Sequence, residues 1–388
     1  MRTEPVLVIF EGGPAPSFPE QMLRDVREAI VIELIEKARG SGLFQSVIVC
    51  TDRPGLARAA ACAGAEVELD EEGGPFHFGR RLQRLIRDRR LDAVCCMGGA
   101  AAPLATRDDL EVIAQAFESR QPFVAANNIH SADIVAFAPA RAVLAIDPPA
   151  IDNALPLALH RQCGLPLVRL ARTLGLQFDV DSPSDIMVLA VHPGTGPRVR
   201  DALRKFDLDA SRYEAAKRAL ANPGADVFLY GRIGAPLFSY LDEYSRCRIR
   251  LVSEERGMKA LGRDERGEVR SVLGYALEAL GMRGFVQCLE SLCRAAFLDT
   301  RVLLAHARRQ VPTADRFYSD LGLPERVGDP WLRELTAAAA GAAVPVLLGG
   351  HGLVTGGVWA LLDAALREAK DRPPGGAAAV TPSVSGRR

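Results

Sequence analysis

The chain has 388 residues, of which 48% are hydrophobic and 25% charged, a composition typical of a globular protein with about two domains. Lys plus Arg and Asp plus Glu both number 48, which argues against a bulk electrostatic attraction to nucleic acid or to a membrane surface. No apolar run reaches the roughly eighteen residues that cross a bilayer, and the start of the sequence lacks the apolar stretch of a signal peptide. We therefore expect a cytoplasmic protein with neither nucleic acid nor membrane as a partner.

In the first half, short β-rich runs alternate with helical patterns. Strands are expected over 6–10, 46–52, 65–70, 92–99, 122–128 and 132–139, with amphipathic helices between most of them. This alternation predicts an α/β fold with a mostly parallel sheet covered by helices on both faces. Ligands of such sheets bind at the carboxyl ends of the strands. The candidate nucleotide-binding residues at these ends are Glu11, Gly12, Gly13, Asp52, Gly98 and Gly99.

Eight cysteines lie mostly among apolar neighbours, without the spacing of a zinc site or of a CxxC redox pair. Cys95 and Cys96 are adjacent on a predicted strand, and Cys288 and Cys293 are too far apart for a CxxC motif. We expect buried, reduced thiols.

The segment LQFDVDSPSDIMVLAV, residues 176–191, carries the most specific motif of the chain. With AVCCMGGAAAPLAT (93–106) and the order of strands and loops, it resembles the GT-A-like nucleotidyltransferases over residues 1–192. The similar families include the molybdenum-cofactor guanylyltransferases and the phospholactate guanylyltransferases of deazaflavin cofactor synthesis. Their closing motif, D-x-D-T-P-x-D-L, is matched by Asp179, Asp181, Ser182, Pro183 and Asp185. The resemblance implies a nucleotide-binding sheet, Mg²⁺ as cofactor, and a nucleoside triphosphate and a small acceptor as partners.

Two departures from this family pattern concern charge. The family's G-D-x-P-L loop holds Mg²⁺ through its Asp, whereas residues 98–104 read GGAAAPL and contain no carboxylate. The family's first loop supplies a basic residue to the phosphates, whereas here residues 11–17 begin with Glu11, which can hold a metal ion or a sugar hydroxyl or can be a solvated loop acid. These departures leave it open whether the first domain is an active transferase.

Asp179 and Asp181 are separated by one residue, so on an extended segment both carboxylates face the same side and can share a metal ion. Alternatively, the segment caps the next helix, with Ser182 or Asp181 as the N-cap and Pro183 in the first position. Both interpretations stay open at the level of sequence.

The second half begins after a break at 193–197. A helical connector is expected over 193–224, a smaller α/β domain over 225–370, and a disordered tail over 371–388. Two glycine-rich strand ends are candidate anion or ligand sites in this domain: Gly231 with Arg232, and Gly349 and Gly350 with His351. No family resemblance is evident for this half.

We therefore expect a nucleotidyltransferase-like protein, with Asp181 and His351 as candidate catalytic residues and Asp179 and Asp181 as candidate Mg²⁺ ligands. The alternative is a catalytically degenerate domain that binds a nucleotide or nucleotide sugar, with the activity in the C-terminal domain. A glycosyltransferase ranks lowest, because no Asp-x-Asp follows a strand near the middle of the first domain.

Overall fold

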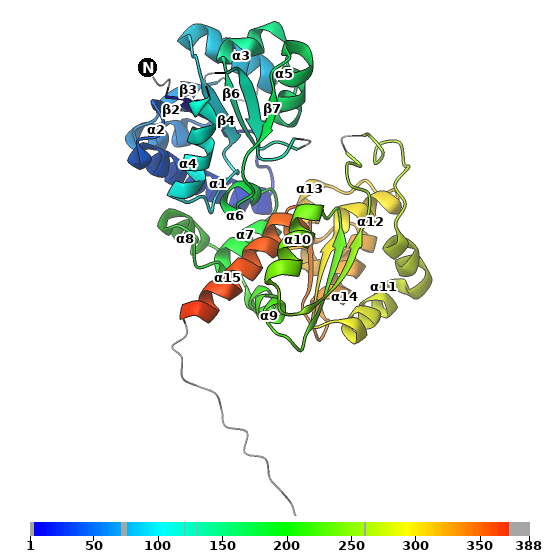
Figure 1. Ribbon diagram of the computed structural model, residues 1–388. Helices are drawn as coiled ribbons and strands as arrows, with labels where there is room; N and C mark the ends of the chain where they lie inside the picture. Colours follow the sequence, from blue (N-terminus) through cyan, green and yellow to red (C-terminus); the bar gives the residue numbers. More distant parts are fainter. Residues whose placement is uncertain (1–3, 71–75, 120, 130, 260, 372–388) are drawn as a thin grey trace, which may run out of the picture.

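The computed structural model describes residues 4–70, 76–119, 121–129, 131–259 and 261–371, and it contains two β-sheets (Figure 1). The first has seven strands in the order β3-β2-β1-β4-β6-β5-β7, and the second has four in the order β11-β10-β8-β9. The predicted fold class, a mostly parallel α/β sheet plus a second, smaller α/β domain, is confirmed. The expected tail lies outside the described residues, except for residue 371.

The first sheet is parallel except for β6, which runs antiparallel to both of its neighbours. Strand β1 pairs with β2 on one side and with β4 on the other, and all five of its residues are buried. The strands are β1 (Val6–Phe10), β2 (Ser46–Thr51), β3 (Glu66–Leu69), β4 (Val94–Gly98), β5 (Phe123–Ala126), β6 (Ile134–Ala138) and β7 (Leu167–Arg169).

Helices cover both faces of this sheet because alternate strand residues are apolar on each side. On one face, Val8 and Phe10 pack with α3 and α5; on the other, Leu7 and Ile9 pack with α1 and α4. The helices are α1 (Phe18–Ser41), α2 (Pro54–Cys62), α3 (Phe78–Arg89), α4 (Arg107–Gln115), α5 (Leu155–Cys163) and the single turn α6 (Leu174–Gln177).

All four strands of the second sheet are parallel. They are β8 (Asp226–Gly231), β9 (Arg248–Ser253), β10 (Ala295–Asp299) and β11 (Val346–Gly349), joined and covered by α10 (Ala235–Tyr244), α11 (Val272–Leu292), α12 (Thr300–His306), α13 (Thr313–Asp320), α14 (Pro330–Ala340) and α15 (Val358–Asp371). The strand order reverses between β8 and β10, which are adjacent in space but not consecutive in the chain. Such a switch point is where open α/β sheets commonly bind ligands.

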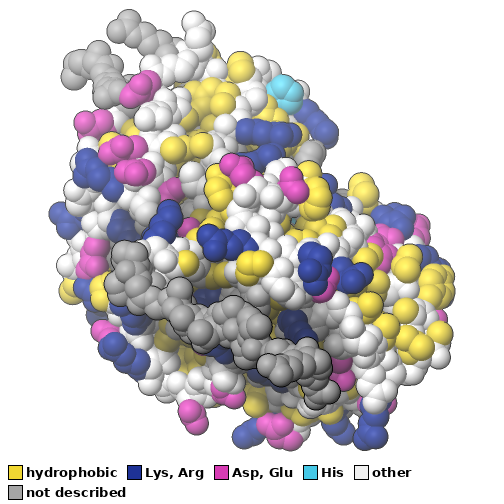
Figure 2. All heavy atoms as spheres, turned by 60° about the horizontal axis from the view of Figure 1, so that its bottom comes forward, with side chains coloured by type: hydrophobic (Ala, Val, Ile, Leu, Met, Phe, Trp, Pro, Cys, Tyr) yellow, Lys and Arg dark blue, Asp and Glu magenta, His cyan; other side chains and the backbone are white. Residues whose placement is uncertain are grey.

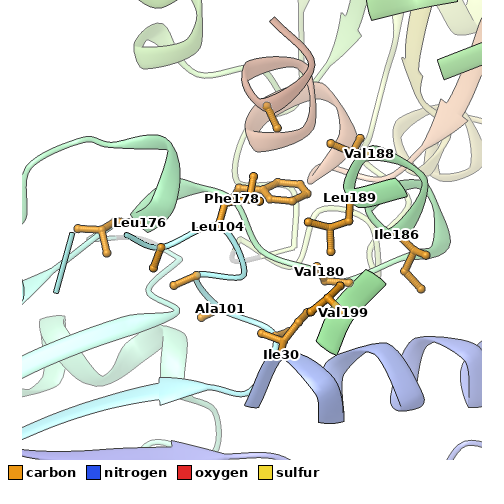
Figure 3. Close-up of a cluster of buried hydrophobic side chains, with 14 of the residues drawn as sticks. Ile30, Ala101, Leu104, Leu176, Phe178, Val180, Ile186, Val188, Leu189 and Val199 are labelled. Atoms are coloured by element: carbon orange, nitrogen blue, oxygen red, sulfur yellow. The ribbon is translucent and has the colours of Figure 1, made fainter. Parts of the chain in front are cut away.

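Three helices join the two domains: α7 (Pro183–Val191), α8 (Pro197–Leu203) and α9 (Ser211–Leu220). The last two lie within the expected connector. One hydrophobic cluster runs through both domains, and Figure 3 shows the part of it built from α1, the loop after β4, the segment 174–180, α7 and α8. His192, at the end of α7, pairs with Asp363 of α15 at 3.2 Å, which ties the first domain to the last helix.

The surface reflects the balanced composition. On the face shown in Figure 2, Lys and Arg side chains are interspersed with Asp and Glu. All eight cysteines are free, and only Cys62 and Cys288 are exposed. None of the helices in the described part of the chain is long and apolar enough to cross a membrane.

Candidate functional site

The loop after β4 and the Asp179 segment lie side by side at the carboxyl edge of the first sheet. Asp179 forms an isolated antiparallel bridge with Ala101, and the Val180 amide donates to the Ala100 carbonyl at 3.1 Å. The two segments that carry the family resemblance are therefore in contact, although about eighty residues separate them in the chain.

A third carboxylate, that of Asp133, belongs to the same edge. Asp133 directly precedes β6, and its carbonyl accepts a hydrogen bond of 3.2 Å from the Gly98 amide. Burial and then the charge of Asp181 raise the pKa of Asp133. Burial and then the charges of Asp181 and Asp133 likewise raise the pKa of Asp179 well above its usual value. The strongest neighbouring charges on these carboxylates are thus negative.

Carboxylates that repel one another in this way are suited to a cation. Mg²⁺ usually binds through one or two carboxylates together with substrate phosphates and water, rather than in an all-protein cage. Within the described ranges, no group of three or more His, Cys, Asp and Glu side chains converges closely enough to hold a metal ion. Asp133, Asp179 and Asp181 therefore do not form a metal cage by themselves, and a Mg²⁺ ion at this edge would need phosphate and water ligands as well.

The helix-capping interpretation accounts for the residues that follow Asp181 in the same segment. Ser182 is the N-cap of α7 in a capping box, and Pro183 follows at the start of the helix. The Asp185 carboxylate accepts from the Asp181 amide at 3.1 Å and from the Ser182 amide and hydroxyl at 2.9 Å each. The cap thus uses Ser182 and Asp185, while Asp181 is exposed and Asp179 half-buried beside it.

The first loop differs from the sequence expectation of a metal ligand or a solvated acid. The Glu11 side chain is 1% exposed and pairs with Arg27 at 3.0 Å and with Arg53 at 3.2 Å. Arg53 also donates to the Gly13 carbonyl at 3.0 Å, and both Asp52 oxygens accept from the Gly13 amide at 3.2 Å. Two arginines therefore reach the edge at which the family places a basic residue, and Glu11 holds them there.

Two of the predicted glycines are required by these contacts. A Cβ at Gly99 would lie 2.5 Å from a Glu11 carboxylate oxygen, and a Cβ at Gly12 would lie 2.5 Å from Asp52 Oδ1. Both distances are too short for any real contact, so the close approach here is between loops of the protein itself.

At the second sheet, the carboxyl ends of β8, β10 and β11 bring together Arg232, Asp299 and His351. Arg232 forms a bidentate pair with the fully buried Asp299, at 2.6 Å and 3.1 Å. Desolvation by the surrounding protein and then the charge of Arg232 lower the pKa of His351, although part of this residue is exposed to solvent. His351 is consequently neutral near pH 7.

The glycine run after β11 packs against the segment that closes the first domain. A Cβ at Gly349 would be 2.6 Å from Ser184 Oγ, one at Gly352 would be 2.8 Å from Asp185 Oδ1, and one at Gly356 would be 2.8 Å from the Gln177 carbonyl. The sequence suggested that these glycines admit a ligand; instead, at these three positions they admit α7 and the turn before it. This packing carries His351 toward Asp181, whose charge is among those that act on the histidine.

The predicted site residues thus form two neighbouring groups. Arg232 and His351 lie together at the second sheet, where the charge of Asp181 also acts on His351, whereas Asp179 lies beside the loop after β4. The others lie at the edge of the first sheet: Glu11, Gly12, Gly13, Asp52, Gly98 and Gly99. Sequence reasoning missed Asp133 and Arg53. The only available signal for either was its position next to a strand end.

No known family model matches the chain, and no curated protein matches it. Among solved structures, a CMP:2-keto-3-deoxy-manno-octonic acid synthetase complexed with CTP is 14% identical, covering 46% of this chain and 94% of its own, with a TM-score of 0.34. A cytidylyltransferase from Leptospira borgpetersenii is 12% identical, covering 52% and 94%, with a TM-score of 0.38. A nucleotidyl transferase from Methanothermobacter is 18% identical, covering 52% and 99%, with a TM-score of 0.36. At these identities the likeness concerns only the fold of about half the chain.

Proposed function

We propose that the protein is a nucleotidyltransferase that binds a nucleoside triphosphate with Mg²⁺ at the carboxyl edge of the first sheet and transfers the nucleotidyl group to a small phosphorylated or acidic acceptor. The observation that carries the proposal is the group of mutually repelling carboxylates, Asp133, Asp179 and Asp181, one of which, Asp181, also acts electrostatically on His351 of the second domain. Carboxylates whose charges repel one another are stabilised by a cation, so this edge suits a metal-bound triphosphate, with the acceptor on the side of His351.

Each side chain then has a chemical task. Asp133 and Asp179 would hold Mg²⁺, which supplies charge neutralisation at the phosphates when it is bound. Arg27 and Arg53, at the same edge of the sheet, would contact the phosphates. An acceptor oxygen attacks the α-phosphorus, the bond to the bridging oxygen breaks, and pyrophosphate leaves. If the acceptor oxygen carries a proton, His351 is the base that takes it, because its lowered pKa keeps the ring neutral.

The test is isothermal titration of the full chain with each nucleoside triphosphate, with and without Mg²⁺. One triphosphate should bind only with Mg²⁺, and Asp179→Asn and Asp133→Asn should each weaken that binding at least tenfold. Asp207→Asn, which changes an exposed carboxylate on the connector, is the matched control and should bind normally. If none of the triphosphates binds with Mg²⁺ to the folded chain, the proposal fails.

The alternative is a domain that binds a nucleotide without transferring it. It is favoured by the Glu11 pairs, which neutralise the two arginines at the phosphate edge. Exchange of labelled pyrophosphate into the triphosphate, measured with a panel of phosphorylated and carboxylate acceptors, separates the two functions. Exchange supports transfer, whereas tight Mg²⁺-dependent binding with no exchange under any acceptor supports the binder.

A further inference from the structure

A separate pocket of about 500 Å³ lies in the second domain, between α12 with the segment 308–311 that follows it, Arg316 of α13, and the segments 258–259 and 264–267. Six basic residues line it, against two acidic ones, Asp264 and Glu265. The basic residues are Lys259, Arg266, Arg301, Arg308, Arg309 and Arg316. In a chain whose acidic and basic residues are equal in number, this is a pronounced local excess of positive charge.

Three of the six cations are neutralised by the protein. Arg301 forms a bidentate pair with the buried Asp320, at 2.6 Å and 2.5 Å. Arg266 pairs with Glu268 at 2.8 Å, and Arg309 pairs with Asp329 at 3.2 Å. The Arg301 pair is the most buried of these, so one side of the pocket is lined by a buried ion pair.

The other three, Lys259, Arg308 and Arg316, form no ion pair with any described carboxylate. Arg316 donates to Thr313 Oγ1 at 2.9 Å, and its Nε is buried without a hydrogen-bond partner in the described structure. The pKa of Lys259 is lowered by desolvation and then by the nearby positive charges, which are those of Arg232, Arg316 and Arg301. Like charges are therefore held close together around a cavity, an arrangement that costs stability unless an anion enters.

We propose that this pocket binds a small molecule through a phosphate or diphosphate group held by Lys259, Arg308 and Arg316. Guanidinium groups bind phosphate oxygens in pairs, and the ammonium group of lysine adds a compact charge. Two observations place the pocket near the end of β11 and near the start of α1. A Cβ at Gly350 would be 3.6 Å from Arg301 Nε, and the charge of Glu20, at the start of α1, acts on Arg316.

Gly350 directly precedes His351, so the part of the pocket formed by Arg301 lies close to this histidine in the fold. We assign the pocket to the phosphate of the acceptor, and this assignment rests on the proposed function. Binding of a phosphorylated molecule in the pocket does not depend on it.

The experiment titrates the full chain with pyrophosphate, inorganic phosphate and glycerol phosphate in Mg²⁺-free chloride buffer. Pyrophosphate or a phosphate ester should bind, and Arg316→Ala and Lys259→Ala should each weaken that binding about tenfold or more. Arg204→Ala, which removes an exposed arginine paired with Asp201 on the connector, is the matched control. Unchanged thermal transitions of the variants show that the pocket, and not folding, is altered.

Asp179→Asn separates this inference from the proposed function. Mg²⁺-free pyrophosphate binding should survive in Asp179→Asn even where triphosphate binding is lost. A pocket that takes the triphosphate itself would be revealed by competition between a nucleotide and glycerol phosphate in the same Mg²⁺-free buffer, and this would overturn its assignment to the acceptor. The inference as a whole is overturned if none of the three probes binds, or if both pocket variants bind them as well as the parent chain does.

Discussion

Gly352 lies so close to Asp185 that a Cβ on this glycine would be 2.8 Å from Asp185 Oδ1. The contact joins the glycine run after β11 to the cap of α7, and that carboxylate oxygen is buried without a hydrogen-bond partner in the described structure. Because the space is already filled, Gly352→Ala should lower the free energy of unfolding by about 1–3 kcal/mol, as overpacking of a tight contact does. Urea titration followed by circular dichroism measures the change.

The control for this prediction is Gly40→Ala. Gly40 lies within the last turn of α1, and a Cβ there would meet nothing within 4 Å. That variant should be as stable as the parent or more stable, by up to about 1 kcal/mol, because alanine favours the helix. Equal losses in both variants would show that the contact with Asp185 is not the cause.

The Arg232–Asp299 pair should make stability depend on pH in a defined direction. Asp299 is fully buried, yet Arg232 outweighs the effect of burial and keeps the pKa of this carboxyl below its usual value. The pair therefore stabilises the fold above about pH 4, the pKa of an unfolded Asp, and that contribution is lost as the pH falls through the lower, folded pKa.

In Arg232→Ala the buried carboxylate loses its partner. We expect a loss of about 3–5 kcal/mol near neutral pH, which shrinks as the pH is lowered toward 4 because Asp299 then becomes protonated. Thermal melts across this range measure the trend. Arg248→Ala breaks the exposed pair with Asp226 and should change the melting temperature little at any pH. A loss in Arg232→Ala that stays constant with pH would contradict the explanation.

Arg212 on α9 stabilises the end of α14. Its guanidinium donates to the carbonyls of Ala339, Ala340, Ala342 and Val344, at 2.7–3.2 Å. Arg212→Ala should cost about 2–3 kcal/mol, because helix-terminal carbonyls lose charged donors. Hydrogen exchange should rise at the end of α14 and in the approach to β11. Arg218→Ala, an exposed arginine on the same helix, should leave both measurements unchanged.

Glu11→Gln tests what the first loop does to a nucleotide. Removing the charge frees Arg27 and leaves Arg53 with only its pair to Glu28 at 3.2 Å among the described residues, so the fold should be weakened by about 1–3 kcal/mol while the affinity for the triphosphate rises severalfold. Titration with Mg²⁺-triphosphate checks this. Glu36→Gln, which breaks an exposed pair with Arg198, should leave affinity unaltered. Weaker binding in Glu11→Gln would mean that Glu11 itself contacts the ligand.

The strands were predictable because their signal is local. Val6–Phe10 was predicted as a buried strand and is one, and the alternation of strands and helices was enough to predict a mostly parallel sheet. Asp133 was missed because β6 inserts antiparallel beside β4, and no local pattern shows which loop a strand will meet. Glu11 was expected to meet solvent or a metal, since the partners that bury it, Arg27 and Arg53, come from other elements.

The glycine run 349–357 illustrates the same limit. Its composition correctly indicated that something must come close to the backbone, but composition cannot tell a ligand from another part of the chain. At three of its positions the approaching group belongs to the segment 177–185, which lies in the other half of the sequence.

The shared cluster also restricts how the molecule can move. Ile186 and Leu189 of α7 pack in the same hydrophobic cluster as Val354, Val358 and Leu361, which lead into and form the last helix. Rotating one domain relative to the other would separate the side chains of this cluster and expose apolar surface to water. The relative position of Asp181 and His351 is therefore set when the chain folds. Any opening and closing around a bound molecule must come from the loops around it, with the two sheets standing still.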